Sequence, residues 1–345
     1  MSPSSVMDRE HPYVFLEIPP EVPFELKPAG EKGWGGFATR FIARNSLIYQ
    51  EPALFTLHLT MTQQVNDSAV LQAVKNLSKN DKQKFNLLHE ASILQGNDNV
   101  SELFITNYFA LAIPSHKHRE LYQPNLLGFF VFISRLNHSC VANAYVPQNM
   151  RKTISCYAAR DIQPGEEITF SYCGEFPNMC RDRRHGLLDF ICHCPACVPG
   201  TRFYELSEMR RQLIRGLHYL LLGLDLASSR RGGPSMIITD PELRDNAEKL
   251  NIPLMSRLFY ESMVGLMLEE EGIMNGLTSE YITNRMSQMA EYLAEKSNVL
   301  AARKIMEQDR WMDRWLLASR TFGVRDRGDW DACATLQLIR AANRP

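Results

Sequence analysis

Hydrophobic and polar positions alternate in the first part of the chain and change to a helical spacing farther along. Alternation begins at about residue 24, meets a glycine cluster at 33–36 and resumes up to residue 48. This pattern predicts strands joined by a glycine loop, after a loose start over residues 1–22 that contains several prolines. Apolar residues then recur every three or four positions, which predicts a helical insertion at about 61–121.

An apolar run from Leu126 to Ile133 leads directly into a cluster of polar side chains, Ser134-Arg135-Leu136-Asn137-His138-Ser139-Cys140. The run predicts a buried strand or helix end. Buried polar side chains need hydrogen-bond partners and make poor core filler, so the cluster indicates a site. A polar turn that closes the buried element is the alternative.

Strand patterns return after this cluster, and helical patterns dominate the rest of the chain. Strands are expected at 145–146 and 153–158, then a Pro-Gly turn at 160–167 and a β-prone segment at 168–172. Helical periodicity is clear in three later stretches, 203–226, 254–268 and 281–302. We therefore predict an α+β chain with a loose segment 1–22, a β-rich domain 23–180, a cysteine-rich segment 181–200 and an all-helical domain 201–345.

Composition and charge exclude some classes of function. The 345 residues are 45% hydrophobic and 22% charged with a formal net charge of −1, as in an ordinary globular protein without a signal for nucleic-acid binding. The basic runs Arg181–His185 and Arg230-Arg231 are short, and solvated surface is the expected explanation. No apolar run has the length of a membrane span, and residues 1–11 lack the apolar stretch of a signal peptide. The expected location is intracellular, with nucleus and cytoplasm not distinguished.

The cysteines predict a metal site. None of the eight precedes Cys140, and Cys192, Cys194 and Cys197 fall within six residues. Clustering in an intracellular chain favours metal over a disulfide framework, and structural zinc takes four ligands. Cys140 is the best candidate for the fourth ligand, because it belongs to the other polar cluster. The competitors are Cys173, Cys180 and, with a strained geometry, His193. Free cysteines in a tight turn are the alternative to a metal.

Four motifs stand in an order that resembles the SET-domain methyltransferases, most closely the branch related to the SET-and-MYND proteins. They are Lys32-Gly33-Trp34-Gly35, Asn137-His138-Ser139-Cys140, Gly165 to Tyr172, and the Cys-x-Cys-x-x-Cys of the post-SET segment; together they cover about Phe24 to Val198. The resemblance implies a β-rich domain in which a pseudoknot brings the Asn-His and Tyr segments together. It also implies S-adenosyl-L-methionine as methyl donor and, usually, a protein lysine as acceptor.

The resemblance also assigns roles to individual residues. Asn107 would meet the cofactor carboxylate, Phe190 would pack on the adenine, and Tyr172 would be the catalytic tyrosine of the methyl-transfer pore. Cys140 would be the distant fourth zinc ligand beside the three clustered cysteines. The full expected cofactor site comprises Lys32, Gly33, Trp34, Gly35, Asn107, Ser134, Asn137, His138, Tyr172 and Phe190.

Three departures from the family pattern bear on function. No cysteine lies between Gly36 and Ile133, so the ligands of a MYND zinc module are absent there, and Ala142 replaces a proline. Leu188 stands where relatives often carry a second pore tyrosine. Because leucine has no hydroxyl, this position favours an alternative in which the acceptor is a small molecule or another nucleophile instead of a protein lysine. A non-catalytic interaction module is a third possibility, and the helical region would serve as substrate wall, docking face or packing cap.

Overall fold

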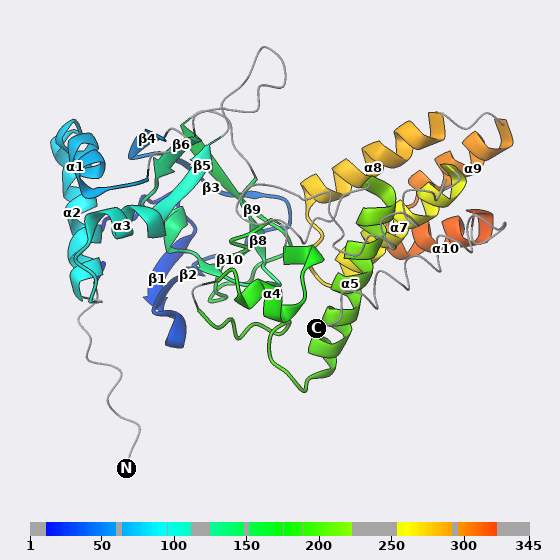
Figure 1. Cartoon of the computed structure of the whole chain (residues 1–345), viewed down its shortest axis with the longest axis horizontal. Coiled ribbons are helices and arrows are strands. Elements are labelled where there is room, and N and C mark those ends of the chain that lie inside the picture. Colours follow the sequence, from blue (N-terminus) through cyan, green and yellow to red (C-terminus); the bar gives the residue numbers. More distant parts are fainter. Residues whose placement is uncertain are drawn as a thin grey trace. The chain divides into compact units, whose positions relative to one another are not determined.

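The computed structural model describes residues 12–59, 64–94, 96–111, 125–147, 152–174, 176–188, 190–222, 254–291 and 296–322. Contacts divide the chain into two compact units (Figure 1). The first comprises Met1–Asn137 and Asn143–Phe170, and the second comprises His138–Ala142 and Ser171–Pro345. The short segment His138–Ala142 of the Asn-His-Ser-Cys motif therefore belongs to the same unit as the cysteine-rich segment and the C-terminal helices.

Small sheets form the framework of the first unit. An antiparallel hairpin consists of β1 (Phe24–Pro28) and β2 (Trp34–Ala38). One three-stranded sheet has the order β3 (Leu47–Pro52), β9 (Thr153–Ala158), β8 (Ala144–Tyr145), and another has the order β4 (Phe55–Leu59), β6 (Asn125–Phe129), β5 (Tyr108–Leu111). Finally, β10 (Thr169–Phe170) pairs with β7 (Asn137–His138), the strand at which the chain passes to the second unit.

The helical insertion comprises α1 (Asp67–Lys75), α2 (Lys79–Leu94) and α3 (Val100–Asn107). Asparagine side chains cap two of these helices: Asn66 accepts from the N–H of Ala69 at 3.0 Å, and Asn99 accepts from that of Glu102 at 3.1 Å. The prediction of a helical insertion up to about residue 121 was wrong at Tyr108–Leu111, and its last part, 112–121, lies outside the described residues. Residues 108–111 form the strand β5, whose backbone pairs with β6. This segment is too short for hydrophobic periodicity alone to distinguish a strand from a helix.

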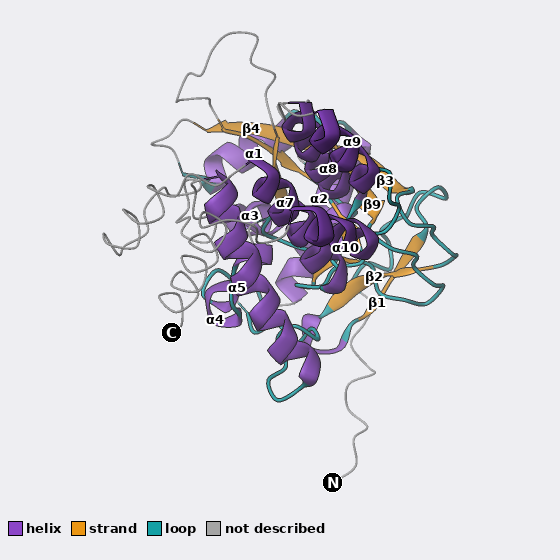
Figure 2. Cartoon of the chain, turned by 90° about the vertical axis from the view of Figure 1, so that its right-hand side faces the viewer, coloured by secondary structure: helices purple, strands orange, loops and turns teal. Residues whose placement is uncertain are grey.

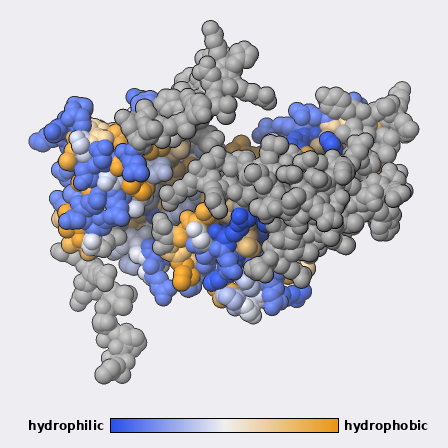
Figure 3. Space-filling model, viewed as in Figure 1, coloured by the Kyte–Doolittle hydropathy of each residue, from blue (hydrophilic) through white to orange (hydrophobic). Residues whose placement is uncertain are grey.

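Aromatic side chains join the insertion to the sheet. Phe129 of β6 stacks on Phe55 of β4 at 5.2 Å between ring centroids and lies 5.5 Å from Phe85 of α2. The expected loose start also contributes, because the side chains of Tyr13 and Leu16 are buried in this core. Apolar side chains exposed on α1–α3 lie among polar ones (Figure 3), as on ordinary protein surfaces.

Helices make up most of the described part of the second unit (Figure 2). They are α4 (Arg181–His185), α5 (Arg202–Leu222), α7 (Leu254–Glu270), α8 (Gly276–Glu291), α9 (Lys296–Met306) and α10 (Trp311–Phe322). The indole of Trp311 packs so closely on α7 that a Cβ on Gly265 would lie 2.2 Å from it. Sequence periodicity indicated α5, α7, α8 and α9 but not α10. Within the described ranges no helix is long and apolar enough to cross a membrane.

Candidate functional site

The glycine loop between β1 and β2 brings backbone close to Asn137. Gly33 adopts a φ of 76°, which favours glycine. At Gly35 a Cβ would lie only 2.7 Å from Asn137 Nδ2 and 2.8 Å from Glu167 Oε1. The dihedral angle therefore favours glycine at position 33, and a side chain at position 35 would displace the Asn137 amide or the Glu167 carboxylate.

Glu167 connects the predicted residues of this loop. Asn137 Nδ2 donates to Glu167 Oε1 at 2.9 Å and to the carbonyl oxygen of Trp34 at 3.2 Å. The Lys32 ammonium forms an ion pair with the other carboxylate oxygen of Glu167. The motif Gly165 to Tyr172 contains Glu167 but gave no signal for this role, which depends on the bridge that Glu167 forms with Phe37 of β2.

A buried carboxylate shapes the turn before the Asn-His motif. Glu51 of β3 accepts hydrogen bonds from the backbone N–H groups of residues 131–133 at 2.6 to 3.0 Å. Burial raises the pKa of Glu51, whereas these three N–H groups act in the opposite direction. Ser134 follows the turn, and its hydroxyl donates to the carbonyl oxygen of Phe130 at 2.7 Å. No sequence signal marked Glu51, because its partners lie about 80 positions away.

Asn107 ends α3 with one half of its amide unsatisfied. Its Nδ2 donates to the carbonyl oxygen of Leu103 at 2.7 Å and to Thr106 Oγ1 at 3.0 Å. Its Oδ1 is buried and has no hydrogen-bond partner within the described part of the chain. Leaving a buried acceptor unpaired is costly, so an N–H donor from a ligand fits this position.

Three of the predicted residues lie together in the second unit. The buried His138 ring lies 5.1 Å from the Tyr172 ring and 6.0 Å from the Phe190 ring, and the latter two are 6.3 Å apart. Tyr172 and Phe190 are 48% and 43% exposed. In this aromatic cluster, the partly exposed rings of Tyr172 and Phe190 therefore lie against the buried imidazole of His138.

Hydrogen bonding defines the tautomer of His138. The backbone N–H of Tyr172 donates to His138 Nδ1 at 3.1 Å, so Nδ1 is the acceptor and the proton resides on Nε2. Nε2 lies 3.3 Å from Cys140 Sγ and donates to that sulfur. One imidazole thus connects the backbone of Tyr172 to Cys140.

The structure brings the four predicted cysteines together. The sulfurs of Cys140, Cys192, Cys194 and Cys197 all lie within 4.8 Å of one another, while the competitors for the fourth place are outside this group. No disulfide joins the cysteines of the described residues. Hydrogen bonds from the other three thiols raise the pKa of Cys140, so a cation is needed to hold all four as thiolates. Four convergent sulfurs match the donor set of structural zinc.

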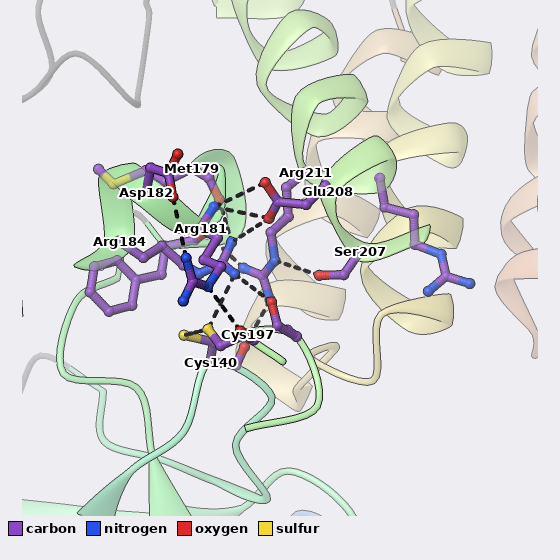
Figure 4. A network of polar contacts seen from close by, with 12 residues as sticks. Cys140, Met179, Arg181, Asp182, Arg184, Cys197, Ser207, Glu208 and Arg211 are labelled. Carbon is purple, nitrogen blue, oxygen red and sulfur yellow. Dashed lines mark hydrogen bonds and ion pairs between the residues drawn. The ribbon is translucent and has the colours of Figure 1, made fainter. Parts of the chain in front are cut away.

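The basic run that begins at Arg181 is not solvated surface throughout, which corrects the sequence prediction for Arg184. Its side chain is fully buried and donates to backbone carbonyls and to Cys197 Sγ, at 3.4 Å (Figure 4). Burial lowers the pKa of this guanidinium, but Cys140, Cys197 and Glu208 together hold it above its usual range. The other run, Arg230-Arg231, lies outside the described residues.

Comparison with known proteins finds similarity over part of the chain. The SET domain family matches residues 33–173. The human "Protein-lysine N-trimethyltransferase SMYD5" is 42% identical over 79 residues, which are 21% of this chain and 18% of that protein. The "Histone-lysine N-methyltransferase set5" of Schizosaccharomyces pombe is 33% identical over 90 residues, 25% of this chain and 28% of the relative. A "SET and MYND domain-containing protein" of Dictyostelium discoideum is 28% identical over 104 residues, 29% of this chain and 30% of the relative.

The chain therefore contains a SET domain. This match confirms the predicted resemblance to the SET-domain methyltransferases, and the Dictyostelium relative is named as a SET and MYND domain-containing protein. Each match spans less than a third of the relative's length. The α+β class expected from the sequence, with a helical insertion and a helical C-terminal region, is confirmed.

Proposed function

We propose that this protein is an S-adenosylmethionine-dependent methyltransferase and that its acceptor is a protein lysine. The observation that carries the proposal is Tyr172, half exposed and fixed by its backbone to the buried His138, at the position of the pore tyrosine in the SET motif. The names of two relatives, a protein-lysine and a histone-lysine methyltransferase, support lysine as the acceptor.

The residues that would bind the cofactor are those that the sequence motifs indicate: Lys32, Gly33, Trp34, Gly35, Asn107, Ser134, Asn137, His138, Tyr172 and Phe190. The unsatisfied Asn107 Oδ1 fits the ammonium group of the methionine part, which offers N–H donors. The exposed ring of Phe190 fits a planar base. S-adenosylmethionine supplies, when bound, a methyl group on a positively charged sulfonium.

The chain would contribute mainly position and environment. His138 fixes the backbone of Tyr172, so the phenol has a defined direction and its oxygen can accept weak C–H contacts from a polarised methyl group. A lysine amine must lose its proton before it attacks. Burial among the aromatic rings and proximity to a cation both lower the pKa of such an amine.

We further propose that zinc binds Cys140, Cys192, Cys194 and Cys197. The mutual sulfur distances within 4.8 Å support this assignment. Zinc would fasten the Cys-x-Cys-x-x-Cys segment to the Asn-His-Ser-Cys motif and so hold Phe190 near His138. An intracellular location is also part of the proposal, because four of the cysteines are arranged for a metal ion, as is common in intracellular proteins.

A methyltransferase acting on a small molecule or another nucleophile is the second candidate. The side chain of Leu188 is partly buried against the cysteine cluster, at the place where many relatives have a second pore tyrosine. A leucine there offers no hydroxyl to orient a lysine amine, which favours a different acceptor.

Incubation with methyl-labelled cofactor tests the proposal. The purified protein is mixed with a panel of proteins and, separately, with small-molecule extracts, and Tyr172→Phe serves as the inactive control. Label on lysine that depends on Tyr172 is the expected result. Label in small molecules alone would favour the second candidate, and cofactor binding without any transfer would indicate a non-catalytic module.

A further inference from the structure

We propose that two buried arginines, Arg184 of α4 and Arg211 of α5, form the outer shell of the metal centre. They would make the C-terminal helices part of that centre rather than a cap over it. This inference rests on the proposed zinc site. Figure 4 shows both guanidinium groups beside Cys140 and Cys197.

Arg184 contacts the ligand set directly. Its Nη2 donates to Cys197 Sγ at 3.4 Å and to the carbonyl oxygen of Ala196 at 2.7 Å. Its Nη1 donates to the carbonyl oxygen of Met179 at 2.6 Å and to Glu208 at 3.3 Å. Both nitrogens of the planar fork are thus occupied, and one donates to a sulfur that would bind the metal.

Arg211 contacts the backbone of Cys140, the zinc ligand that is remote in sequence from the other three. Its Nη2 donates to the carbonyl oxygen of Cys140 at 2.9 Å, and its Nη1 donates to that of Phe176 at 2.7 Å. The carboxylate of Glu271 forms an ion pair with Arg211 at 2.9 Å, and both side chains are fully buried. Gly272, with a φ of 74°, ends α7 immediately after Glu271 and directs the chain past Val141.

The charge of the metal centre explains why the guanidinium group of Arg184 is buried here. Burying an arginine is expensive unless negative charge and acceptors compensate it. Zinc bound by four thiolates has a net charge of −2. Arg184 brings a positive charge to this centre, whereas the charge of Arg211 is already compensated by the buried Glu271. N–H donors to sulfur, or to the backbone of a ligand, favour the thiolate form. Without such a centre, the carboxylate that compensates Arg184 among the described residues would be that of Glu208, which is itself partly exposed.

The first experiment measures the zinc affinity of Arg184→Gln by competition with a chromogenic chelator. Arg183→Gln is the matched control, because Arg183 is an exposed neighbour on the same helix. We expect Arg184→Gln to bind zinc about 10- to 100-fold more weakly, as for loss of an outer-shell partner, and the control to match wild type. Arg184→Lys, which keeps the charge but not the fork, should fall between them. Equal affinity of Arg184→Gln and the control would overturn the proposal.

A second measurement separates this role from a purely structural one. With saturating zinc, the thermal midpoint of Arg184→Gln should return toward that of wild type, because metal binding stabilises the folded state by mass action. A loss of stability that zinc does not reduce would contradict the proposal. If wild type itself retains no zinc, the proposed zinc site is refuted, and the outer shell with it.

The third measurement tests Arg211 with cobalt in place of zinc. The charge-transfer absorption of bound Co²⁺ reports thiolate ligation. We expect the band of Arg211→Gln to be weak, like that of Cys140→Ser, because the guanidinium group no longer binds the Cys140 carbonyl oxygen. Arg202→Gln is the matched control, because Arg202 is exposed on the same helix, and it should keep the wild-type band. A wild-type band in Arg211→Gln would remove Arg211 from the outer shell.

Discussion

Replacing Cys140 by serine should separate the remote zinc ligand from the three local ones. Cys140 and Cys192 lie 52 positions apart, so a metal that binds both closes a long loop. A cross-link over a loop of that length reduces the entropy of the unfolded chain by about 4 kcal/mol of stability in the simple chain model. Cys140→Ser should therefore cost the zinc-loaded protein up to about 4 kcal/mol and weaken its retention of zinc.

Urea denaturation followed by tryptophan fluorescence measures this cost. Trp311 and Trp315 report on the second unit, which contains all four cysteines. The difference between wild type and Cys140→Ser should be large with zinc and small in excess chelator. Cys180→Ser is the matched control, because Cys180 lies outside the cysteine group. If Cys140→Ser retains one zinc per chain and full stability, Cys140 is not a ligand.

Three further changes should give distinct results. Tyr172→Phe deletes one hydroxyl and should slow methyl transfer by about 10²-fold, while calorimetry shows nearly unchanged cofactor affinity; unaltered turnover would mean that the ring only packs. Gly35→Ala places a Cβ 2.7 Å from Asn137 Nδ2 and should weaken cofactor binding at least about tenfold, whereas Gly174→Ala, with open space around it, should not. Burial and a nearby arginine lower the pKa of His218 to about 4, so its neutral form stabilises the protein above pH 6.5. That contribution, at most about 3 kcal/mol, should be lost as pH falls toward 4, and His218→Gln should flatten the dependence; an identical pH profile would refute it.

Features set by local pattern could be predicted from the sequence. Three cysteines within six residues had to converge, and a polar cluster behind an apolar run predicted that Cys140 would join them, as it does. Helical periodicity likewise located α5 and α7, whose apolar faces are long enough to be read without knowledge of their partners.

Features set by remote partners could not be predicted. Arg184 occurs in a run of charged residues that is typical of a solvated surface, and only the sulfur and carbonyl acceptors of distant segments explain its burial. The burial of Glu51 could not be predicted for the same reason, since its three N–H partners lie far along the chain. β5 follows α3 without a break, and pairing with β6 decides its conformation.

The contact between Arg211 and Cys140 also has a consequence for the timing of synthesis. Cys140 leaves the ribosome 71 residues before Arg211 and 131 residues before Glu271. At 5–20 residues per second, the buried salt bridge behind the Asn-His-Ser-Cys motif is completed roughly ten seconds after that motif is made. During this interval the Cys140 thiol is accessible to oxidants and to other metals. A nascent chain stalled before residue 211 should therefore be alkylated readily at Cys140, and a chain released at full length should resist.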